Sequence, residues 1–383
     1  MKQIYLDNQA TTMVDPEVFS AMEPWLKYQF GNAASRNHIF GWAAEEAVEI
    51  ARELIADFIG VNPNEIIFTS GATEANNLAI QGAALNASSN KKHIITLKTE
   101  HKAVLDICDY LEKNGFSITR LPVNKEGMID LALIEKSIKK ETLLVSVMHV
   151  NNEIGVIQPI KDIGKLCKAK GILFHVDAAQ SVGKLPINVE SFDIDLLSIS
   201  AHKFYGPKGV GALYVRRKNP RVSLSPLLYG GGHERGLRSG TLPVHQIVGM
   251  GKACQIAARV MEDETKRISL LRDQLLNGIK QHVPNSRVNG SMEHRLAGNL
   301  NMSFPGTQNE AIIAAVPEIA ISSGAACTTS TMEPSHVLLA LGLSKEMAYS
   351  SLRFGIGRFN TKQDIDTAVE VISRCMKKLQ FRS

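Results

Sequence analysis

The chain has 383 residues, 44% of them hydrophobic and 6% aromatic, and carries a formal net charge of +5. This length and apolar content predict two or three domains with complete hydrophobic cores. The mild charge, without a run of lysine or arginine, and the low aromatic content exclude a nucleic-acid-binding stripe and a base-stacking surface.

The N-terminal residues lack the apolar core of a signal peptide. The most apolar stretch, residues 311–321, is interrupted by Pro317 and Glu318, so we expect no membrane span. The five cysteines are an odd number without paired spacing, which is typical of a reducing compartment. We therefore expect a cytoplasmic protein.

Strand-like and helix-like segments alternate from about residue 32 to residue 215, which predicts an α/β fold with a mainly parallel sheet covered by helices. In the first clear unit, residues 65–80, a strand is followed by the turn Ser70, Gly71, Ala72, Thr73 and then a helix. Such a turn offers backbone N–H groups and a helix dipole to an anion. Ordinary capping of the helix around Thr73 and Glu74 is the alternative.

Two later apolar runs end in residues with ionisable or reactive side chains. Residues 171–176 lead to Asp177, and residues 194–199 lead to Ser200, His202 and Lys203. A Gly-Pro turn and another strand-like run, residues 210–215, follow. Functional residues of α/β proteins gather at the carboxyl ends of strands.

Asp177 and Lys203 are far enough apart for helix and turn material between two neighbouring parallel strands. A buried carboxylate needs a cation or strong donors, and a partly desolvated lysine amine can act as a nucleophile or base. A lysine that forms a Schiff base and a carboxylate that keeps a ring nitrogen protonated are the two groups that pyridoxal phosphate requires. The pair therefore favours a pyridoxal phosphate site, although most lysines are surface groups.

The remaining segments predict a second, smaller domain. A long amphipathic helical pattern covers residues 253–283, and short strand-like runs follow at 299–304, 319–322 and 351–355. The last helical pattern covers residues 364–379. We expect a large domain of residues 16–260 and a small α+β domain of residues 1–15 and 261–383.

Cys327 differs from the other cysteines. It stands among small and polar residues, a composition typical of a loop, and an exposed thiol can become a nucleophilic thiolate. The other four lie among apolar residues in helix-like stretches and are predicted to be packing residues: Cys108, Cys167, Cys254 and Cys375. The cysteines and histidines show no pair spacing typical of zinc, so no metal is expected.

Over nearly its whole length the chain resembles the cysteine desulfurases, fold-type I pyridoxal phosphate enzymes of the class V aminotransferase family. The resemblance implies a large domain with a seven-stranded, mainly parallel sheet and a small domain. The motifs that carry it are YLDNQATT at 5–12, SGATE at 70–74, TEHK at 99–102, HVNNEIG at 149–155, HVDAAQ at 175–180, SAHK at 200–203, RSGT at 238–241, SSGAAC at 322–327 and SLRFGIGR at 351–358.

The resemblance also implies a role for each matched residue. Lys203 would carry the cofactor, Asp177 would pair with the ring nitrogen, and His101 would stack on the ring and move protons. The further cofactor ligands would be Ala72, Thr73, Asn152, Gln180, Ser200 and His202, with Thr241 supplied by a second subunit. Asn32 and Arg353 would bind the substrate carboxylate, and Cys327 would accept the sulfur.

The implied activity converts L-cysteine to L-alanine and leaves a persulfide on Cys327. The implied partners are a second copy of the chain and sulfur-acceptor proteins that serve iron–sulfur cluster assembly or tRNA thiolation. Two alternatives stay open. A selenocysteine lyase or small-molecule aminotransferase would share Lys203 and Asp177 without needing Cys327, and a non-catalytic member would be expected to have lost Lys203.

Overall fold

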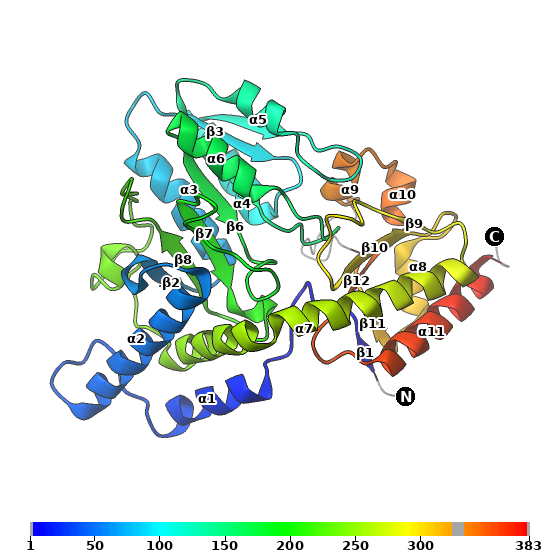
Figure 1. Cartoon of the computed structure of the whole chain (residues 1–383), viewed down its shortest axis with the longest axis horizontal. Helices are drawn as coiled ribbons and strands as arrows, with labels where there is room; N and C mark the ends of the chain where they lie inside the picture. The colour runs from blue at the N-terminus through cyan, green and yellow to red at the C-terminus, as the bar shows by residue number, and fades with distance from the viewer. Residues whose placement is uncertain (1–2, 324–332, 381–383) are drawn as a thin grey trace.

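The computed structural model describes residues 3–323 and 333–380. Its centre is a seven-stranded sheet, shown at the upper left of Figure 1. In spatial order the strands are β2 (Ile66–Thr69), β8 (Gly211–Val215), β7 (Leu196–Ser200), β6 (Leu173–Asp177), β5 (Thr142–Met148), β3 (His93–Leu97) and β4 (Ser117–Leu121). Within this sheet β8 alone runs against the others. The predicted α/β fold with a mainly parallel sheet is confirmed.

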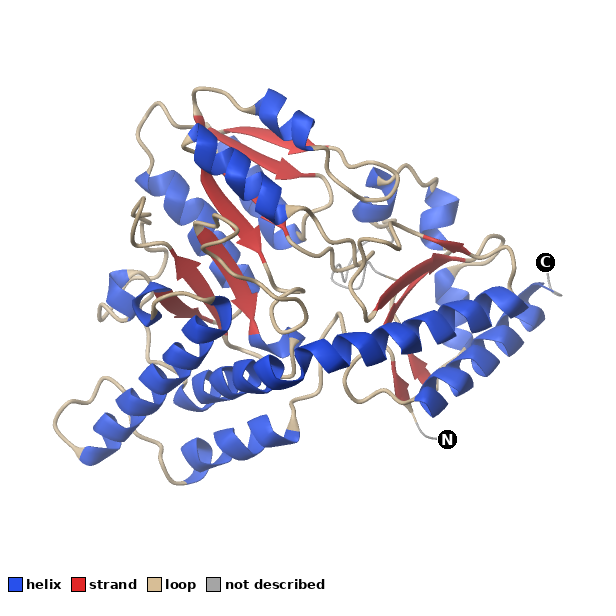
Figure 2. Cartoon of the chain, in the orientation of Figure 1, coloured by secondary structure: helices blue, strands red, loops and turns tan. Residues whose placement is uncertain are grey.

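Helices cover both faces of the sheet, as Figure 2 shows. Alternate residues of a strand face opposite sides, so Ile66 and Phe68 join the core under α1, α2, α6 and α7, whereas Ile67 joins the core under α3 and α4. The helices of this part are α1 (Pro16–Lys27), α2 (Ile39–Ile59), α3 (Ala72–Asn86), α4 (Lys102–Lys113), α5 (Leu131–Ser137) and α6 (Ile160–Lys170), with short 3₁₀ turns η1 (Pro63–Glu65), η2 (Ala201–Lys203) and η3 (Glu234–Gly236).

Helix α7 (Val244–His282) is shared by two hydrophobic cores. Its first half packs on the large sheet, and from Ile268 onward it packs in a second core. The sequence predicted a start at residue 253, and this boundary was wrong. Gly249 and Gly251 weaken the helical pattern, but they are needed for close packing: a Cβ on Gly251 would lie 2.9 Å from the Ala51 Cα.

The second core is built on smaller sheets. One has the order β12 (Ser351–Gly355), β10 (Asn299–Ser303), β9 (Arg287–Val288), and β1 (Ile4–Tyr5) pairs with β11 (Ile319–Ala320). The helices α8 (Asn309–Ala315), α9 (His336–Ala340), α10 (Lys345–Tyr349) and α11 (Lys362–Gln380) complete this part. Both ends of the chain lie beside it in Figure 1. The predicted domain boundary near residue 260 stays a prediction.

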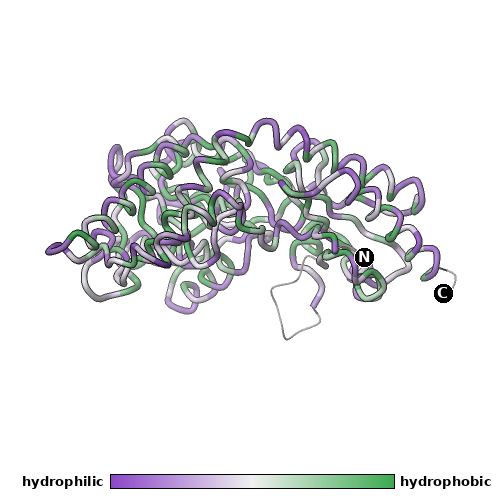
Figure 3. The backbone as a smooth tube through the Cα atoms, turned by 90° about the horizontal axis from the view of Figure 1, so that it is seen from below, coloured by the Kyte–Doolittle hydropathy of each residue, from purple (hydrophilic) through white to green (hydrophobic). Residues whose placement is uncertain are grey.

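The hydropathy of the chain follows this layering. In Figure 3 hydrophobic segments run through the interior, and hydrophilic turns lie along the outside of the helices. None of the helices in the described part of the chain is long and apolar enough to cross a membrane.

Candidate active site

A cavity of about 550 Å³ lies at the carboxyl edge of the large sheet, and β12 contributes Arg353 to its wall. The cavity brings together most of the predicted site residues: Ala72, Thr73, His101, Asn152, Asp177, Gln180, Ser200, His202, Lys203 and Arg353. All except Arg353 lie at or just after the carboxyl end of a strand of the large sheet. The parallel order of the strands is what gathers them, because their carboxyl ends meet at one edge.

The turn between β2 and α3 is built as an anion cradle. Gly71 is the N-cap residue of α3, has φ of 150°, and provides no side-chain cap for the first helical N–H groups. The turn also lies against β8, where a Cβ on Gly211 would come within 2.7 Å of the Gly71 Cα. The predicted alternative, capping around Thr73 and Glu74, occurs in part, because the Glu74 carboxylate accepts a hydrogen bond from the Ser70 N–H (2.8 Å). Gly71 gives α3 no side-chain cap, so the first N–H groups of the helix suit a phosphate.

Asp177 ends β6 and is 5% exposed. Its Oδ1 accepts a hydrogen bond from the Ala179 N–H (2.9 Å), and its Oδ2 accepts one from Asn76 Nδ2 (2.7 Å). These are neutral donors, and no salt bridge involves this carboxylate in the described part of the chain. A buried carboxylate held in this way suits a positively charged ring nitrogen.

Lys203 lies next to Asp177 in the topology, because β6 and β7 are adjacent and parallel. The expected helix between the two strands is wrong: residues 178–195 form turns. Lys203 occupies the end of η2, and its Nζ donates to the carbonyl oxygens of Gln9 (2.8 Å) and Ala10 (2.7 Å). The N-terminal segment therefore fixes the position of the Lys203 amine.

Two histidines of the cavity have defined hydrogen bonds. His101 is the N-cap residue of α4, and its Nδ1 accepts from the Ala103 N–H (3.1 Å), so its neutral ring carries the proton on Nε2. His202 Nδ1 lies 3.0 Å from Thr11 Oγ1. Burial and the nearby lysines, Lys203 first among them, lower the pKa of His202 to about 4. His202 is therefore neutral at neutral pH.

Gln180 is fixed at both ends of its amide. Its Nε2 donates to Gln9 O (2.8 Å), and its Oε1 accepts from Lys184 Nζ (3.3 Å). Burial and the positive charges of Lys203 and Arg353 lower the pKa of Lys184 to about 7. Neither Gln9 nor Lys184 was predicted to belong to the site, although Gln9 lies in the motif at residues 5–12.

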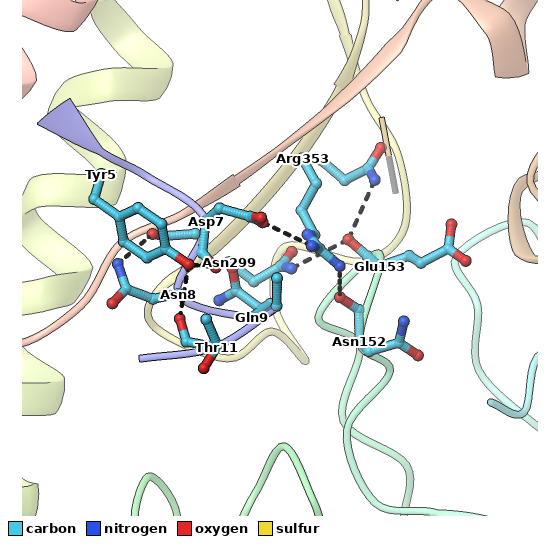
Figure 4. A network of polar contacts seen from close by, with 12 residues as sticks. Tyr5, Asp7, Asn8, Gln9, Thr11, Asn152, Glu153, Asn299 and Arg353 are labelled. Carbon is cyan, nitrogen blue, oxygen red and sulfur yellow. Dashed lines mark hydrogen bonds and ion pairs between the residues drawn. The ribbon is translucent and has the colours of Figure 1, made fainter. Parts of the chain in front are cut away.

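Arg353 joins the two parts of the molecule, as Figure 4 shows. Its Nη1 donates to Asn152 O (3.0 Å), and its Nη2 donates to Asp7 Oδ1 (2.7 Å). Its buried Nε has no hydrogen-bond partner. A guanidinium that lines a cavity and is held in one orientation is suited to a carboxylate ligand.

Two buried glutamates near the cavity, Glu100 and Glu153, were not predicted from the sequence. Burial raises the pKa of Glu153 to about 7, although Ser335, Arg353 and His101 act to lower it. Burial raises the pKa of Glu100 well above its usual value, and Asp177 raises it further. The Glu153 side chain accepts a hydrogen bond from Ser335 Oγ, which caps α9.

Two predicted residues in the described part of the chain, Asn32 and Thr241, do not line the cavity of their own chain. Asn32 is exposed in the α1–α2 loop, where its Oδ1 accepts from the Ala34 N–H (2.9 Å), and Thr241 is exposed before α7. Cys327 lies outside the described residues, so its predicted role stays a prediction. Its described flanks meet the site: Ser322 pairs with the Arg353 backbone, and Glu333 lines the cavity.

The other four cysteines are buried free thiols in helices, as predicted. Burial raises the pKa of Cys108 and of Cys167 to about 12. Burial also raises the pKa of Cys254 and of Cys375. Buried thiols with raised pKa values are poor nucleophiles.

The residues of the cavity fit pyridoxal phosphate. The uncapped N-terminus of α3, with Ser200 and His202 beside it, suits the phosphate, and Asp177 suits the ring nitrogen. Lys203 supplies the amine, and the cavity is large enough for the cofactor and a small amino acid. No group of histidine, cysteine, aspartate or glutamate in the described ranges could hold a metal ion.

Comparison with known proteins agrees with this geometry. The family model for aminotransferase class-V matches residues 4–368. The chain is 56% identical over 379 residues to the protein named cysteine desulfurase IscS of Pasteurella multocida, covering 98% of this chain and 93% of that protein. A solved structure named NifS-like protein has a TM-score of 0.92 and 36% identity, covering 98% of this chain and 100% of that chain. Another, "SspA in complex with cysteine", has a TM-score of 0.80 and 38% identity, covering 94% and 100% respectively.

Proposed function

The chain belongs to the aminotransferase class-V family and is a pyridoxal phosphate-dependent cysteine desulfurase of fold type I, and we propose that Cys327 receives the sulfur of L-cysteine. The relatives favour this activity over a selenocysteine lyase or an aminotransferase, since they carry the desulfurase name over nearly the whole chain. The observation that carries the residue roles is the meeting of Asp177 and Lys203 in one cavity, at the ends of adjacent parallel strands.

We assign the cofactor contacts as follows. The N–H groups that begin α3, with Thr73, Ser200 and neutral His202, would hold the phosphate, and Asp177 would hold the ring nitrogen. Gln180, Asn152 and His101 would hold the rest of the ring. When bound, pyridoxal phosphate supplies an electron-withdrawing ring that stabilises negative charge at the substrate Cα.

The protein groups then handle the substrate and its protons. Arg353 binds the α-carboxylate, because it lines the cavity and its guanidinium is held in place by Asn152 O and Asp7 Oδ1. Lys203 Nζ removes the Cα proton, and the Nε2–H of His101 donates a hydrogen bond in the cavity.

The sulfur step involves Cys327. Its thiolate attacks the sulfur of the substrate, so an S–S bond forms while the Cβ–S bond breaks. The electron pair of the broken bond stays with the carbon, which takes up a proton and becomes the methyl group of L-alanine. The protein retains a persulfide, and no outside oxidant is needed.

One assay tests this function. Purified holoenzyme, incubated with L-cysteine and a thiol reductant, should release alanine and sulfide in equal amounts. A 2-oxo acid in place of alanine would favour an aminotransferase. Turnover of selenocysteine with none of cysteine would favour a lyase.

We also propose a homodimer with shared sites, in which Thr241 and Asn32 act at the cavity of the partner. Its support is the exposed position of both residues and an apolar patch around the α1–α2 loop. The patch consists of Tyr28, Phe30, Ile39, Phe40 and Trp42, each at least 49% exposed. Exposed apolar patches of this kind mark association surfaces.

The acceptors of the sulfur are proposed to be proteins of iron–sulfur cluster assembly or of tRNA thiolation. The relatives named IscS support the first group. The free thiols of the four buried cysteines suit a reducing compartment such as the cytoplasm, where we place the enzyme.

A further inference from the structure

The N-terminal segment reaches Arg353 along a strand edge. β12 pairs with β10 on one side. On its other side the Gly355 N–H donates to Leu6 O (2.6 Å), and the Asn8 N–H donates to Gly355 O (3.1 Å). Asp7 is thereby placed beside β12 by backbone hydrogen bonds, which do not depend on its side chain.

The Asp7 carboxylate is turned toward the guanidinium of Arg353, as Figure 4 shows. The two side chains form a salt bridge of 2.7 Å and are 18% and 4% exposed respectively. The second fixed partner of Arg353 is Asn152 O at 3.0 Å, from the loop after β5. Segments from three distant parts of the sequence therefore meet at this arginine.

This arrangement defines the orientation of the arginine. A buried guanidinium without an anion is unfavourable, and Asp7 offsets that charge before any substrate arrives. Because Nη1 and Nη2 each have a fixed partner, the planar group has one favoured orientation. The Nε–H stays without a partner in a residue that lines the cavity.

We propose that Asp7 is a positioning residue that orients Arg353 for the α-carboxylate of the amino-acid substrate and so sets the preference of the enzyme for a free carboxylate. This rests on the proposed function, in which Arg353 binds that carboxylate. The opposite role is competition, in which Asp7 occupies the arginine and weakens substrate binding. The two roles predict opposite effects of removing the charge.

The test compares acids with their amides on the holoenzyme. Steady-state kinetics use L-cysteine and L-cysteinamide, and calorimetry measures the binding of L-alanine and L-alaninamide. Asp7→Asn should raise KM for L-cysteine and Kd for L-alanine by roughly tenfold or more, the loss expected for a weakened charge-assisted hydrogen bond. The values for both amides and kcat should change little.

Tyr5→Phe is the matched control. The Tyr5 hydroxyl lies 3.2 Å from Asp7 O and 3.0 Å from Thr11 O, so the control loosens the same segment without touching the carboxylate. It should keep the preference for the acid. In an Arg353→Gln background, Asp7→Asn should have no further effect on that preference, because Asp7 acts through the arginine.

The outcomes distinguish the proposed role of Arg353 from that of Asp7. A wild type that binds the acid and the amide equally would remove the proposed role of Arg353. A selective wild type with an Asp7→Asn variant that binds L-alanine as tightly or more tightly would overturn the role of Asp7 alone. Should Asp7→Asn fail to fold, Asp7→Glu replaces it: moving the carboxylate by one methylene must still disturb the guanidinium, so an unchanged preference also overturns the proposal.

Discussion

The Asp177 carboxylate is held by the side-chain amide of Asn76, whose Nδ2 donates to Asp177 Oδ2 at 2.7 Å. Asn76 is 1% exposed on α3, the helix whose N-terminus forms the anion cradle. One helix therefore places both the phosphate cradle and the carboxylate that receives the ring nitrogen. The two ends of the cofactor site are linked through this hydrogen bond.

Removing Asp177 or its partner Asn76 should reduce the catalytic rate more than it reduces the binding of the cofactor. Asp177→Ala should retain part of the cofactor and lose most of the turnover, because an unprotonated ring is a weak electron sink. Asn76→Ala should lower kcat by roughly 10- to 100-fold, the value of a hydrogen bond to a charged group. Asn86→Ala, at the exposed far end of the same helix, is the control. Near wild-type turnover of Asp177→Ala with a normal cofactor load would refute the assignment.

Lys203 should give the protein its colour. The purified enzyme should be yellow, and Lys203→Ala should lose the visible absorption of the lysine-bound cofactor while its thermal unfolding stays cooperative. Lys208→Ala removes another lysine of the same cavity and should keep the absorption. A Lys203→Ala spectrum identical to that of the wild type would show that another group carries the cofactor.

Glu153 should make stability depend on pH. Burial raises its pKa in the folded protein from 4.5 to about 7, so the protonated form is favoured by folding. The stabilisation is complete below about pH 4.5 and is lost as pH rises through 7. Glu153→Gln lacks this loss. Between pH 5 and 8 its free energy of unfolding should therefore rise relative to that of the wild type by up to about 3 kcal/mol, and its melting temperature should rise relative to the wild type as well. Parallel melting curves, matching those of the exposed control Glu53→Gln, would contradict this.

The patch around the α1–α2 loop should be required for association. Sedimentation equilibrium should give twice the mass of the chain, and Phe30→Glu with Ile39→Glu should yield monomers with little activity. Phe30 and Ile39 are 73% and 69% exposed in the single chain, so their replacement should not unfold it. A monomer that is fully active at assay concentration would count against shared sites.

The sequence predicted the parts of the site that follow strand ends. Apolar runs that stop at Asp177 and at Ser200 mark buried strands, and parallel strands bring such ends together without further information. The turn at Gly71 was predictable because it also follows an apolar run that forms a buried strand, β2. The four packing cysteines were also predicted, because they sit in apolar helical patterns.

The sequence could not show groups that act through backbone atoms or through burial. Gln9 and Ala10 hold Lys203 with their backbone carbonyl oxygens. The direction of a backbone carbonyl cannot be predicted from the identity of the residue. Burial raises the pKa of Glu153, and that burial comes from the tertiary fold rather than from the residue type. The missing helix between Asp177 and Lys203 has a similar cause, since the connection is held by tertiary contacts such as Gln180 with Gln9.

The most direct test of the account is peptide mass spectrometry of the holoenzyme after incubation with L-cysteine. We predict one added sulfur atom on the peptide that contains Cys327. Cys327→Ser should still bind pyridoxal phosphate and exchange the Cα hydrogen of cysteine with solvent, yet form no persulfide and almost no alanine. Substituting Cys108, Cys167, Cys254 or Cys375 should leave turnover largely intact. An added sulfur on another peptide, or full alanine production by Cys327→Ser, would contradict the proposed mechanism.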